Sequence, residues 1–292
     1  MEKNLCGKTA LVTGGSRGLG AAAARRPAAA GADVAVSYEK SAHKADGVVK
    51  EVEEFGVRAH AYRADQGDRD EVIGLVAGVA ERFGHIDILV NNAAVFLGGG
   101  PPGSLSREES RRLRDINVHG VVTTTTEALR HMPDGGRIIS IGTISARRAF
   151  AAGFGDYGAT KAAISAYGRS WAHELAPRDI TVHTVVSAFA LTDMGIPQDS
   201  EIGKVLLSLA PFHRYARPEE VAAAVGFLAG SDASCITGTD LNVDGGWNAW
   251  SGPMERAPTV SSIVFCQLLR RCSGAVQKGG PTGGFLGSTR SF

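Results

Sequence analysis

The sequence lacks the features that mark a secreted, membrane or nucleic-acid-binding protein. Its 292 residues include four cysteines, with no C-x-x-C pair and no histidine at zinc-ligand spacing, so we expect reduced thiols and no metal site. No apolar run approaches the roughly 18 residues of a membrane span, and residues 1–5 do not begin a signal peptide. The net charge of +1 shows no basic excess. We therefore expect a cytoplasmic globular protein with neither nucleic-acid nor membrane partners.

Charge and glycine are distributed unevenly along the chain. Residues 251–292 hold five basic residues against the single acid Glu255, a net charge of +4, which leaves −3 for residues 1–250. The same segment is rich in glycine, proline and serine, notably at 279–284, a composition typical of flexible chain. We expect one globular domain over residues 1–250 and a basic, poorly ordered tail over 251–292.

Apolar, strand-like segments alternate with helical patterns along residues 1–250, and the helical patterns include 106–131, 156–177 and 217–230. Nearly continuous apolar strands are typical of a parallel sheet with helices on both faces. The predicted fold class is therefore α/β, with a seven-stranded parallel sheet flanked by helices. The expected strands span residues 8–13, 33–37, 57–62, 86–90, 137–141, 180–186 and 240–243.

Pro27 conflicts with the first expected helix, which should end near Gly31. Proline removes a backbone donor and clashes with the preceding turn, which costs about 3 kcal/mol in the middle of a helix. We therefore predict a kink or an early end at this position.

A glycine-rich loop lies where the first strand gives way to a helix. Glycines allow a sharp turn and a close approach to a pyrophosphate, and the helix N-terminus adds free N–H groups. Nucleotide binding is thus favoured over a plain turn. The loop also matches G-x-S-x-G, the nucleophile elbow of serine hydrolases, with His183 or His213 as the base. The two glycines beyond the serine disfavour that alternative. The loop reads Thr13-Gly14-Gly15-Ser16-Arg17-Gly18-Leu19-Gly20.

The residues after the second strand indicate which dinucleotide is bound. A carboxylate there accepts a hydrogen bond from the adenosine ribose and repels a 2′-phosphate. This chain has Ser37 and Tyr38, with Glu39 one step beyond, and Arg17 lies in the glycine loop. Because guanidinium and hydroxyl groups suit a phosphate, NADP(H) is favoured over NAD(H), and Glu39 is the residue that argues against this.

Tyr157 and Lys161 lie four residues apart on the helical pattern 156–177 and so share one face. An adjacent ammonium stabilises a phenolate, so we expect Lys161 to lower the pKa of Tyr157 from about 10. A tyrosine and a lysine at this spacing are frequent on helix surfaces, so the pair indicates a catalytic site only in combination with other motifs.

Four motifs together resemble the short-chain dehydrogenase/reductase family, most of all its 3-oxoacyl-carrier-protein-reductase-type members. The resemblance runs from about residue 5 to 250. It implies a single Rossmann-type doubly wound domain with a substrate lid at about 190–215, and a homotetramer or homodimer built through helices 106–131 and 156–177. The motifs are the glycine loop, Asn91-Asn92-Ala93-Ala94, Asn117, and Tyr157 with Lys161.

The resemblance also assigns roles. Tyr157 would give a proton to a carbonyl oxygen, or take one from an alcohol, while Lys161 would hold the nicotinamide ribose and Asn117 would anchor a relay water. The hydride comes from the cofactor. The residues expected at the cofactor are Gly14, Ser16, Arg17, Gly18, Leu19, Gly20, Ser37, Tyr38, Asp65 (at the adenine), Asn91, Ala93, Tyr157, Lys161 and Thr192 (at the carboxamide).

Three positions depart from the family's pattern. Thr143 replaces the catalytic serine and keeps its hydroxyl, but the added methyl restricts the rotamer; Ser145, on the same face, is a second donor. Ser187-Ala188 replaces Pro-Gly, and Ala94 replaces a glycine. The resemblance implies an NADPH-dependent reductase of ketone or 3-oxo groups. The alternative is a catalytically weak or non-catalytic dinucleotide-binding protein.

The lid segment is rich in apolar side chains. They suit a hydrophobic or thioester-linked carbonyl substrate, but an amphipathic helix that packs on the sheet would have the same pattern. The apolar residues are Met194, Ile196, Leu206, Leu207, Leu209 and Phe212.

Overall fold

The computed structural model describes residues 3–149, 152–193 and 195–249. The tail predicted over 251–292 and the lid residue Met194 lie outside these ranges. Within them, no helix is both long enough and apolar enough to cross a membrane. The described residues also contain no cluster of three or more His, Cys, Asp or Glu side chains that could hold a metal ion.

The described strands form one parallel sheet in the order β3-β2-β1-β4-β5-β6-β7. The chain runs outward from β1 to β3 and then returns to place β4 beside β1. Ligands bind outside the carboxyl ends of the strands at such a reversal. The strands are β1 (Thr9–Val12), β2 (Asp33–Tyr38), β3 (Ala59–Arg63), β4 (Ile88–Asn91), β5 (Arg137–Thr143), β6 (Thr181–Ser187) and β7 (Asp240–Val243).

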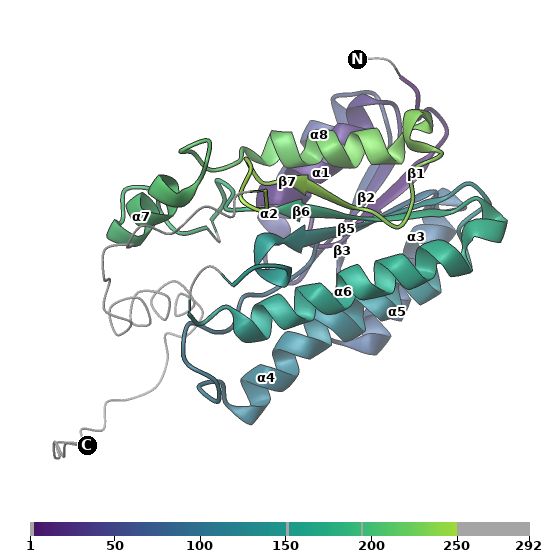
Figure 1. Cartoon of the computed structure of the whole chain (residues 1–292). Helices are drawn as coiled ribbons and strands as arrows, with labels where there is room; N and C mark the ends of the chain where they lie inside the picture. Colours follow the sequence, from purple (N-terminus) through teal and green to yellow (C-terminus); the bar gives the residue numbers. More distant parts are fainter. Residues whose placement is uncertain (1–2, 150–151, 194, 250–292) are drawn as a thin grey trace, which may run out of the picture.

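Helices cover both faces of the sheet (Figure 1). One layer consists of α1 (Gly18–Ala29), α2 (Ala42–Glu53) and α8 (Pro218–Ala229). The other consists of α3 (Arg69–Phe83), α4 (Arg107–Arg114), α5 (Gly120–Ala128) and α6 (Gly155–Glu174), while α7 (Glu201–Leu209) lies beyond one end of the sheet (Figure 1).

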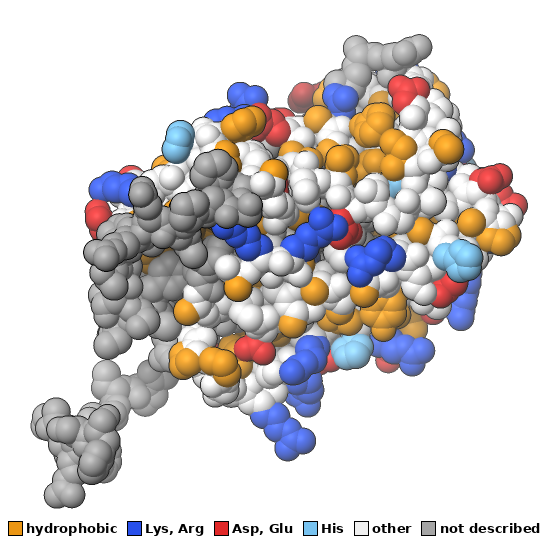
Figure 2. Space-filling model, in the orientation of Figure 1, with side chains coloured by type: hydrophobic (Ala, Val, Ile, Leu, Met, Phe, Trp, Pro, Cys, Tyr) orange, Lys and Arg blue, Asp and Glu red, His pale blue; other side chains and the backbone are white. Residues whose placement is uncertain are grey.

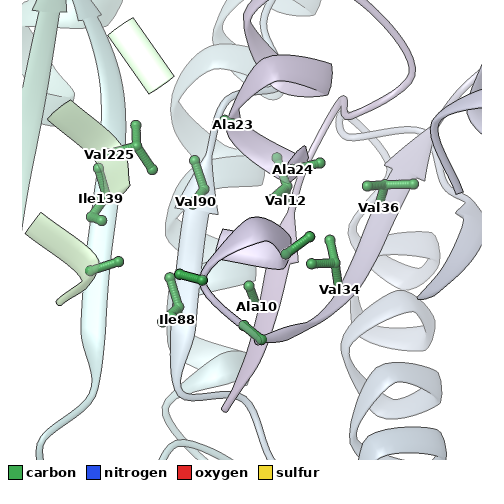
Figure 3. Close-up of a cluster of buried hydrophobic side chains, with 14 of the residues drawn as sticks. Ala10, Val12, Ala23, Ala24, Val34, Val36, Ile88, Val90, Ile139 and Val225 are labelled. Atoms are coloured by element: carbon green, nitrogen blue, oxygen red, sulfur yellow. The ribbon is translucent and has the colours of Figure 1, made fainter. Parts of the chain in front are cut away.

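Two apolar clusters hold these layers together. Successive strand residues point to opposite faces, so Val12 packs toward α1 and α8 while Leu11 packs toward α3. The alanine-rich face of α1 lets that helix lie close to the sheet. Figure 3 shows the first cluster, which includes Ala10, Val12, Ala23, Ala24, Val34, Val36, Ile88, Val90, Ile139 and Val225.

The sequence placed every strand within two residues of its observed ends. The helix predicted over 106–131 is instead divided into α4, a π-helical turn at Asp115–His119, and α5. A π turn widens the backbone by one residue and is frequent at functional sites. The apolar pattern runs through it without a break, which is why the sequence did not reveal it.

Pro27 lies in the last turn of α1, not in its middle as predicted, and the helix ends two residues later at Ala29. The Pro27 carbonyl accepts hydrogen bonds from the backbone N–H groups of Ala30 and Ala32, each at 3.0 Å. The helix therefore continues past Pro27 and ends close to Gly31, so it has no early end at the proline itself.

Candidate active site

The glycine loop between β1 and α1 leaves room for a ligand to approach the backbone. Gly14 and Gly18 have φ angles of 64° and 55°, which favour glycine, and a Cβ at Gly20 would collide with the Gly14 carbonyl oxygen. Helix α1 starts with no side-chain cap and no acidic residue in its first turn. Its first N–H groups and positive dipole end therefore fit the pyrophosphate of a dinucleotide.

The loop is fixed to the ends of two neighbouring strands. Thr13 Oγ1 accepts from the backbone N–H groups of Asn92 and Ala93, each at 3.0 Å. The Asn92 amide in turn donates to the carbonyl oxygens of Thr13 and Gly14. The sequence did not single out Thr13 or Asn92, although Asn92 belongs to the motif after the fourth strand.

Ser37 has a different position from the one expected. Its hydroxyl is buried, with 2% of the residue exposed, and accepts from the Gly14 N–H at 3.1 Å. Ser37 therefore shapes the glycine loop instead of facing a phosphate. Tyr38, the next residue, ends β2 and is half-buried.

Asn91 is the last residue of β4, and Ala93 lies two residues beyond it, next to the glycine loop. The Asn91 side chain is buried and donates to Thr125 Oγ1 of α5 at 3.1 Å. Ala93 packs on Gly14, because a Cβ at Gly14 would lie 2.9 Å from the Ala93 Cα. Both residues thus stand beside the proposed cofactor loop, Ala93 more directly.

The segment after β6 crosses over the same loop. Thr192 Cγ2 would lie 3.1 Å from a Cβ at Gly18. The Asp193 carboxylate lies 2.8 Å from Lys44 Nζ of α2 and 3.6 Å from Arg17 Nη1. Hydrogen bonding to Lys44, with the added charge of Arg17, holds the pKa of Asp193 below its usual range. The sequence predicted Arg17 and Thr192 but neither Lys44 nor Asp193.

A second ionic group lies at the ends of β2 and β3. Asp65 accepts from the Gly67 N–H at 2.8 Å and pairs with Arg112 of α4 at 2.8 Å. Glu39 pairs with Lys40 at 3.2 Å and lies 3.6 Å from the same Arg112 nitrogen. Asp65 was expected at the adenine, whereas the sequence gave no indication of Arg112.

Helix α6 brings Tyr157 and Lys161 beside the end of β5. A Cβ at Gly158 would lie 2.5 Å from the Ser145 carbonyl oxygen, so glycine allows the helix to pack directly on the turn after β5. Lys161 is 4% exposed, and its Nζ donates to the Ile141 carbonyl at 2.9 Å. Burial lowers the pKa of Lys161 to about 8.

Burial also raises the pKa of Tyr157 to about 12, so the net decrease that the sequence predicted beside Lys161 is not found. The phenolate would lose its hydration in apolar surroundings, and the Lys161 ammonium is bonded to Ile141. Phe96 packs against the phenol with ring centroids 5.2 Å apart, and Phe154 packs against Phe96. A tyrosine in this state keeps its proton at neutral pH and is available as an acid.

Asn117 lies in the π-helical turn and is fully buried. Its amide accepts from the Val95 N–H and donates to the Val95 carbonyl, each at 2.9 Å, and it also donates to Thr160 Oγ1 at 3.2 Å. Asn117 therefore ties the segment after β4 to α6, one residue before Lys161. The relay water expected at Asn117 stays a prediction.

Thr143 ends β5 and is followed by a 3₁₀ turn, Ile144–Ala146. Its Oγ1 lies 3.2 Å from Ser145 Oγ. The two hydroxyls are neighbours, as predicted, but the turn brings them together and not the alternation of an extended strand. The end of β5 thus presents two hydroxyl groups next to Gly158, the residue that follows Tyr157.

Comparison with known proteins agrees with this geometry. A family profile described as enoyl-(acyl carrier protein) reductase matches residues 14–248. The chain belongs to the short-chain dehydrogenase/reductase family. The 3-oxoacyl-(acyl-carrier-protein) reductase FabG of Staphylococcus aureus is 35% identical to this chain over 244 residues, which are 82% of this chain and 97% of that protein.

Two solved structures have a similar fold. A short-chain dehydrogenase from Burkholderia cenocepacia in complex with NADP is 44% identical, with a TM-score of 0.81 over 84% of this chain and 99% of that one. A blue fluorescent protein from a metagenomic library in complex with NADPH is 42% identical, with the same TM-score and coverage.

The segment predicted as a lid, residues 190–215, contains α7. Ile202 and Leu206 are buried in a cluster with Ile144 and Trp247, so they pack on the body of the protein. Phe212, in contrast, is 64% exposed. Packing on the body of the protein thus accounts for part of the apolar pattern of this segment. The cluster includes Ile144, the residue directly after Thr143.

The serine-hydrolase alternative has no support in the described residues. His183 lies inside β6 with 1% of its surface exposed, and His213 bonds the Leu207 carbonyl at 3.2 Å. Within the described ranges, neither ring nitrogen of His183 has a hydrogen-bond partner. Neither of the two nominated histidines is thus placed as a base for Ser16 in the described part of the chain.

Proposed function

We propose that the protein reduces ketone or 3-oxo groups with NADPH, or oxidises the corresponding secondary alcohols. The observation that carries this proposal is the convergence of Tyr157, Lys161, Asn117 and Thr143 at the end of β5, beside a loop that fits a dinucleotide. A non-catalytic member of the family would have no need for a buried lysine at this point.

The residues divide the chemistry of the reduction among them. The hydride for the carbonyl carbon comes from the bound cofactor. Tyr157 donates the proton from Oη to the carbonyl oxygen, because burial keeps its phenol protonated. The Thr143 hydroxyl donates a hydrogen bond to the same oxygen as negative charge develops on it. Lys161 holds the nicotinamide ribose and stabilises the phenolate that Tyr157 leaves.

NADP(H) is preferred over NAD(H) in this proposal. Arg17 and Lys44 offer two cations beside the glycine loop, and Glu39 is paired with Lys40. The related structures that contain NADP and NADPH support the same choice. Asp193 competes for both cations, so binding of a 2′-phosphate requires Asp193 to exchange its partners.

The substrate class follows from the surroundings of Thr143. The apolar cluster of α7 begins at Ile144, which suits a carbonyl compound with a hydrophobic or thioester-linked body. The relative from Staphylococcus aureus is named a 3-oxoacyl-(acyl-carrier-protein) reductase, and the matching family profile an enoyl-(acyl carrier protein) reductase. The neighbouring hydroxyls of Thr143 and Ser145 can donate hydrogen bonds to a carbonyl oxygen of the substrate, which favours the 3-oxo group.

We also propose a homotetramer or homodimer built through the α4–α5 segment and α6. Tyr167 is 40% exposed on α6 and stacks on Trp171, with ring centroids 5.0 Å apart. Light scattering of the purified chain gives the number of subunits. A monomer at every concentration would refute this part of the proposal.

The experiment that tests the function is a substrate panel with NADPH consumption as the readout. The panel contains ketones, aldehydes, 3-oxoacyl thioesters and enoyl thioesters, each with NADPH and with NADH. We expect turnover of 3-oxo compounds with NADPH. Binding of NADPH without turnover of any compound would support the non-catalytic alternative, and turnover of enoyl thioesters alone would assign a different reaction.

A further inference from the structure

Arg112 connects two acidic residues that follow neighbouring strands. One guanidinium nitrogen, Nη2, lies 2.8 Å from the Asp65 carboxylate and 3.6 Å from Glu39 Oε1. The side chain is half-buried, with 36% of it exposed. A Cβ at Gly67 would lie 2.5 Å from the other nitrogen, Nη1, so the absence of a side chain at Gly67 makes room for the guanidinium.

This group lies where the adenosine end of a dinucleotide is expected. Strands β2 and β3 pair in parallel, with Tyr38 opposite Arg63, so Glu39 and Asp65 leave the same edge of the sheet side by side. A carboxylate after the second strand normally binds the ribose 2′-OH of NAD(H) and repels the 2′-phosphate of NADP(H). Glu39 is therefore a carboxylate in an unfavourable place for the proposed cofactor.

The charges around Glu39 remove this conflict. Lys40 and Arg112 place two positive charges within 3.6 Å of its carboxylate. Arg112 is anchored by Asp65 and seated over Gly67, so it holds a fixed position, whereas Lys40 has a side chain that is 71% exposed. Both cations reduce the negative potential that a 2′-phosphate would meet, and Arg112 is the one of the two that is held in place.

We propose that Arg112 of α4 is a specificity-determining residue, which neutralises Glu39 and so allows the enzyme to prefer NADPH despite a carboxylate after the second strand. The inference rests on the proposed NADPH preference. Arg112 acts through Glu39 as a positioning residue. Its effect should appear in cofactor selectivity and not in the chemical step.

The test measures the dissociation constants of NADPH and NADH for Arg112→Gln by fluorescence titration of the full chain. We expect the ratio of the NADH constant to the NADPH constant to fall about fivefold, the effect of one partly exposed ion pair. A loss of contacts between Asp65 and the adenine affects both cofactors alike, whereas the double variant described next separates the charge of Asp65 from that of Glu39. Arg114→Gln is the matched control, because Arg114 lies on the same helix and bonds Ser110 within it. It should leave the ratio unchanged.

The double variant Glu39→Gln/Arg112→Gln decides between two roles of Arg112. If Arg112 acts by neutralising Glu39, the double variant regains most of the wild-type ratio. A ratio that stays low would overturn the proposal, since it would mean that Arg112 serves the phosphate without Glu39. An unchanged ratio in Arg112→Gln would overturn it as well. Raised salt should weaken the effect of Arg112→Gln, because salt screens partly exposed charges.

Two further measurements keep the outcome unambiguous. Lys40→Gln removes the exposed partner of Glu39 and should lower the ratio in the same direction, which allows the test even if Arg112→Gln fails to fold. Arg112→Lys retains a positive charge and should keep most of the preference. A wild-type enzyme that binds NADH and NADPH equally would instead refute the NADPH preference of the proposed function, before any variant is made.

Discussion

Tyr157 is partly buried and Lys161 is buried, and the loss of hydration moves their proton affinities in opposite directions. It raises the pKa of Tyr157 to about 12 and lowers that of Lys161 to about 8, because the charged form is disfavoured in both groups. At neutral pH the site therefore combines a neutral phenol with an ammonium. This is the protonation state that a proton donor with a cationic neighbour requires.

The value of kcat/KM for reduction should fall as the pH rises through about 8, the pKa of Lys161. Below this value Lys161 is charged and stabilises the phenolate that Tyr157 leaves, and above it the charge is lost. Tyr157 itself keeps its proton until about 12, so it does not cause the fall. A pH–rate profile checks this. A rate that stays constant to roughly pH 10 would show that the Lys161 charge is not needed.

Thr143→Ala should lower kcat by about tenfold to a thousandfold, because a hydrogen bond to the developing oxyanion is lost. Thr143→Ser, which retains the hydroxyl and removes the crowding methyl, serves as the matched comparison and should keep kcat. Steady-state kinetics of both variants give the answer. Full kcat in Thr143→Ala would show that this hydroxyl is not used.

At the scale of the element, the β1–α1 connection explains why glycine is required. Gly20 lies in the first turn of α1, where its backbone touches the Gly14 carbonyl and the Asn92 amide. Any side chain at Gly20 would push α1 away from the loop. The helix N-terminus would then lose its alignment with the pyrophosphate.

Gly20→Ala should therefore weaken NADPH binding by at least about tenfold and lower the Tm, since overpacking typically costs about 1–3 kcal/mol. Gly74→Ala is the control, because Gly74 is exposed within α3 and a Cβ there meets nothing within 4 Å. That variant should be neutral or slightly more stable. Wild-type binding in Gly20→Ala would contradict the close packing of loop and helix.

The sequence predicted the positions of the strands and helices well, but not the contacts between side chains that are far apart along the chain. Apolar segments bounded by glycine and polar residues were sufficient to place the strands. The π-helical turn at Asp115–His119 leaves no break in the apolar pattern, so the sequence predicted one long helix there. Arg112 and Asp65 are 47 residues apart, and Lys44 and Asp193 are 149 apart, so only the folded chain brings each pair together. The pKa of Tyr157 likewise depends on burial that spacing alone does not reveal.

At the scale of the whole molecule, every predicted catalytic group lies at the carboxyl edge of the sheet or in a helix packed beside it. The remaining surface carries mixed charge: Figure 2 shows basic and acidic side chains interspersed on one face, with hydrophobic ones between them. In the interior, His183 of β6 is a polar group with no hydrogen-bond partner among the described residues. Its burial, and the charge of Arg137, lower its pKa to about 4.

His183 should make the folded protein sensitive to acid. The folded state holds the ring neutral down to about pH 4, whereas the unfolded chain takes up a proton near the ordinary value of 6.5, so stability falls as the pH drops from 6.5 toward 4. The full difference corresponds to about 3 kcal/mol. Urea unfolding of the wild type and of His183→Leu, across this pH range, tests it. An equal pH dependence in the two proteins would contradict the assignment.

The central claim is that Tyr157, partly buried at the start of α6, is the proton donor of an NADPH-dependent reductase. The most direct measurement compares kcat of the wild type and of Tyr157→Phe on an active 3-oxo substrate, together with the dissociation constant of NADPH for each. The account predicts that kcat falls by at least about a hundredfold, and by far more than the affinity for NADPH, because the hydroxyl that supplies the proton is removed. A Tyr157→Phe enzyme that keeps wild-type kcat would contradict it.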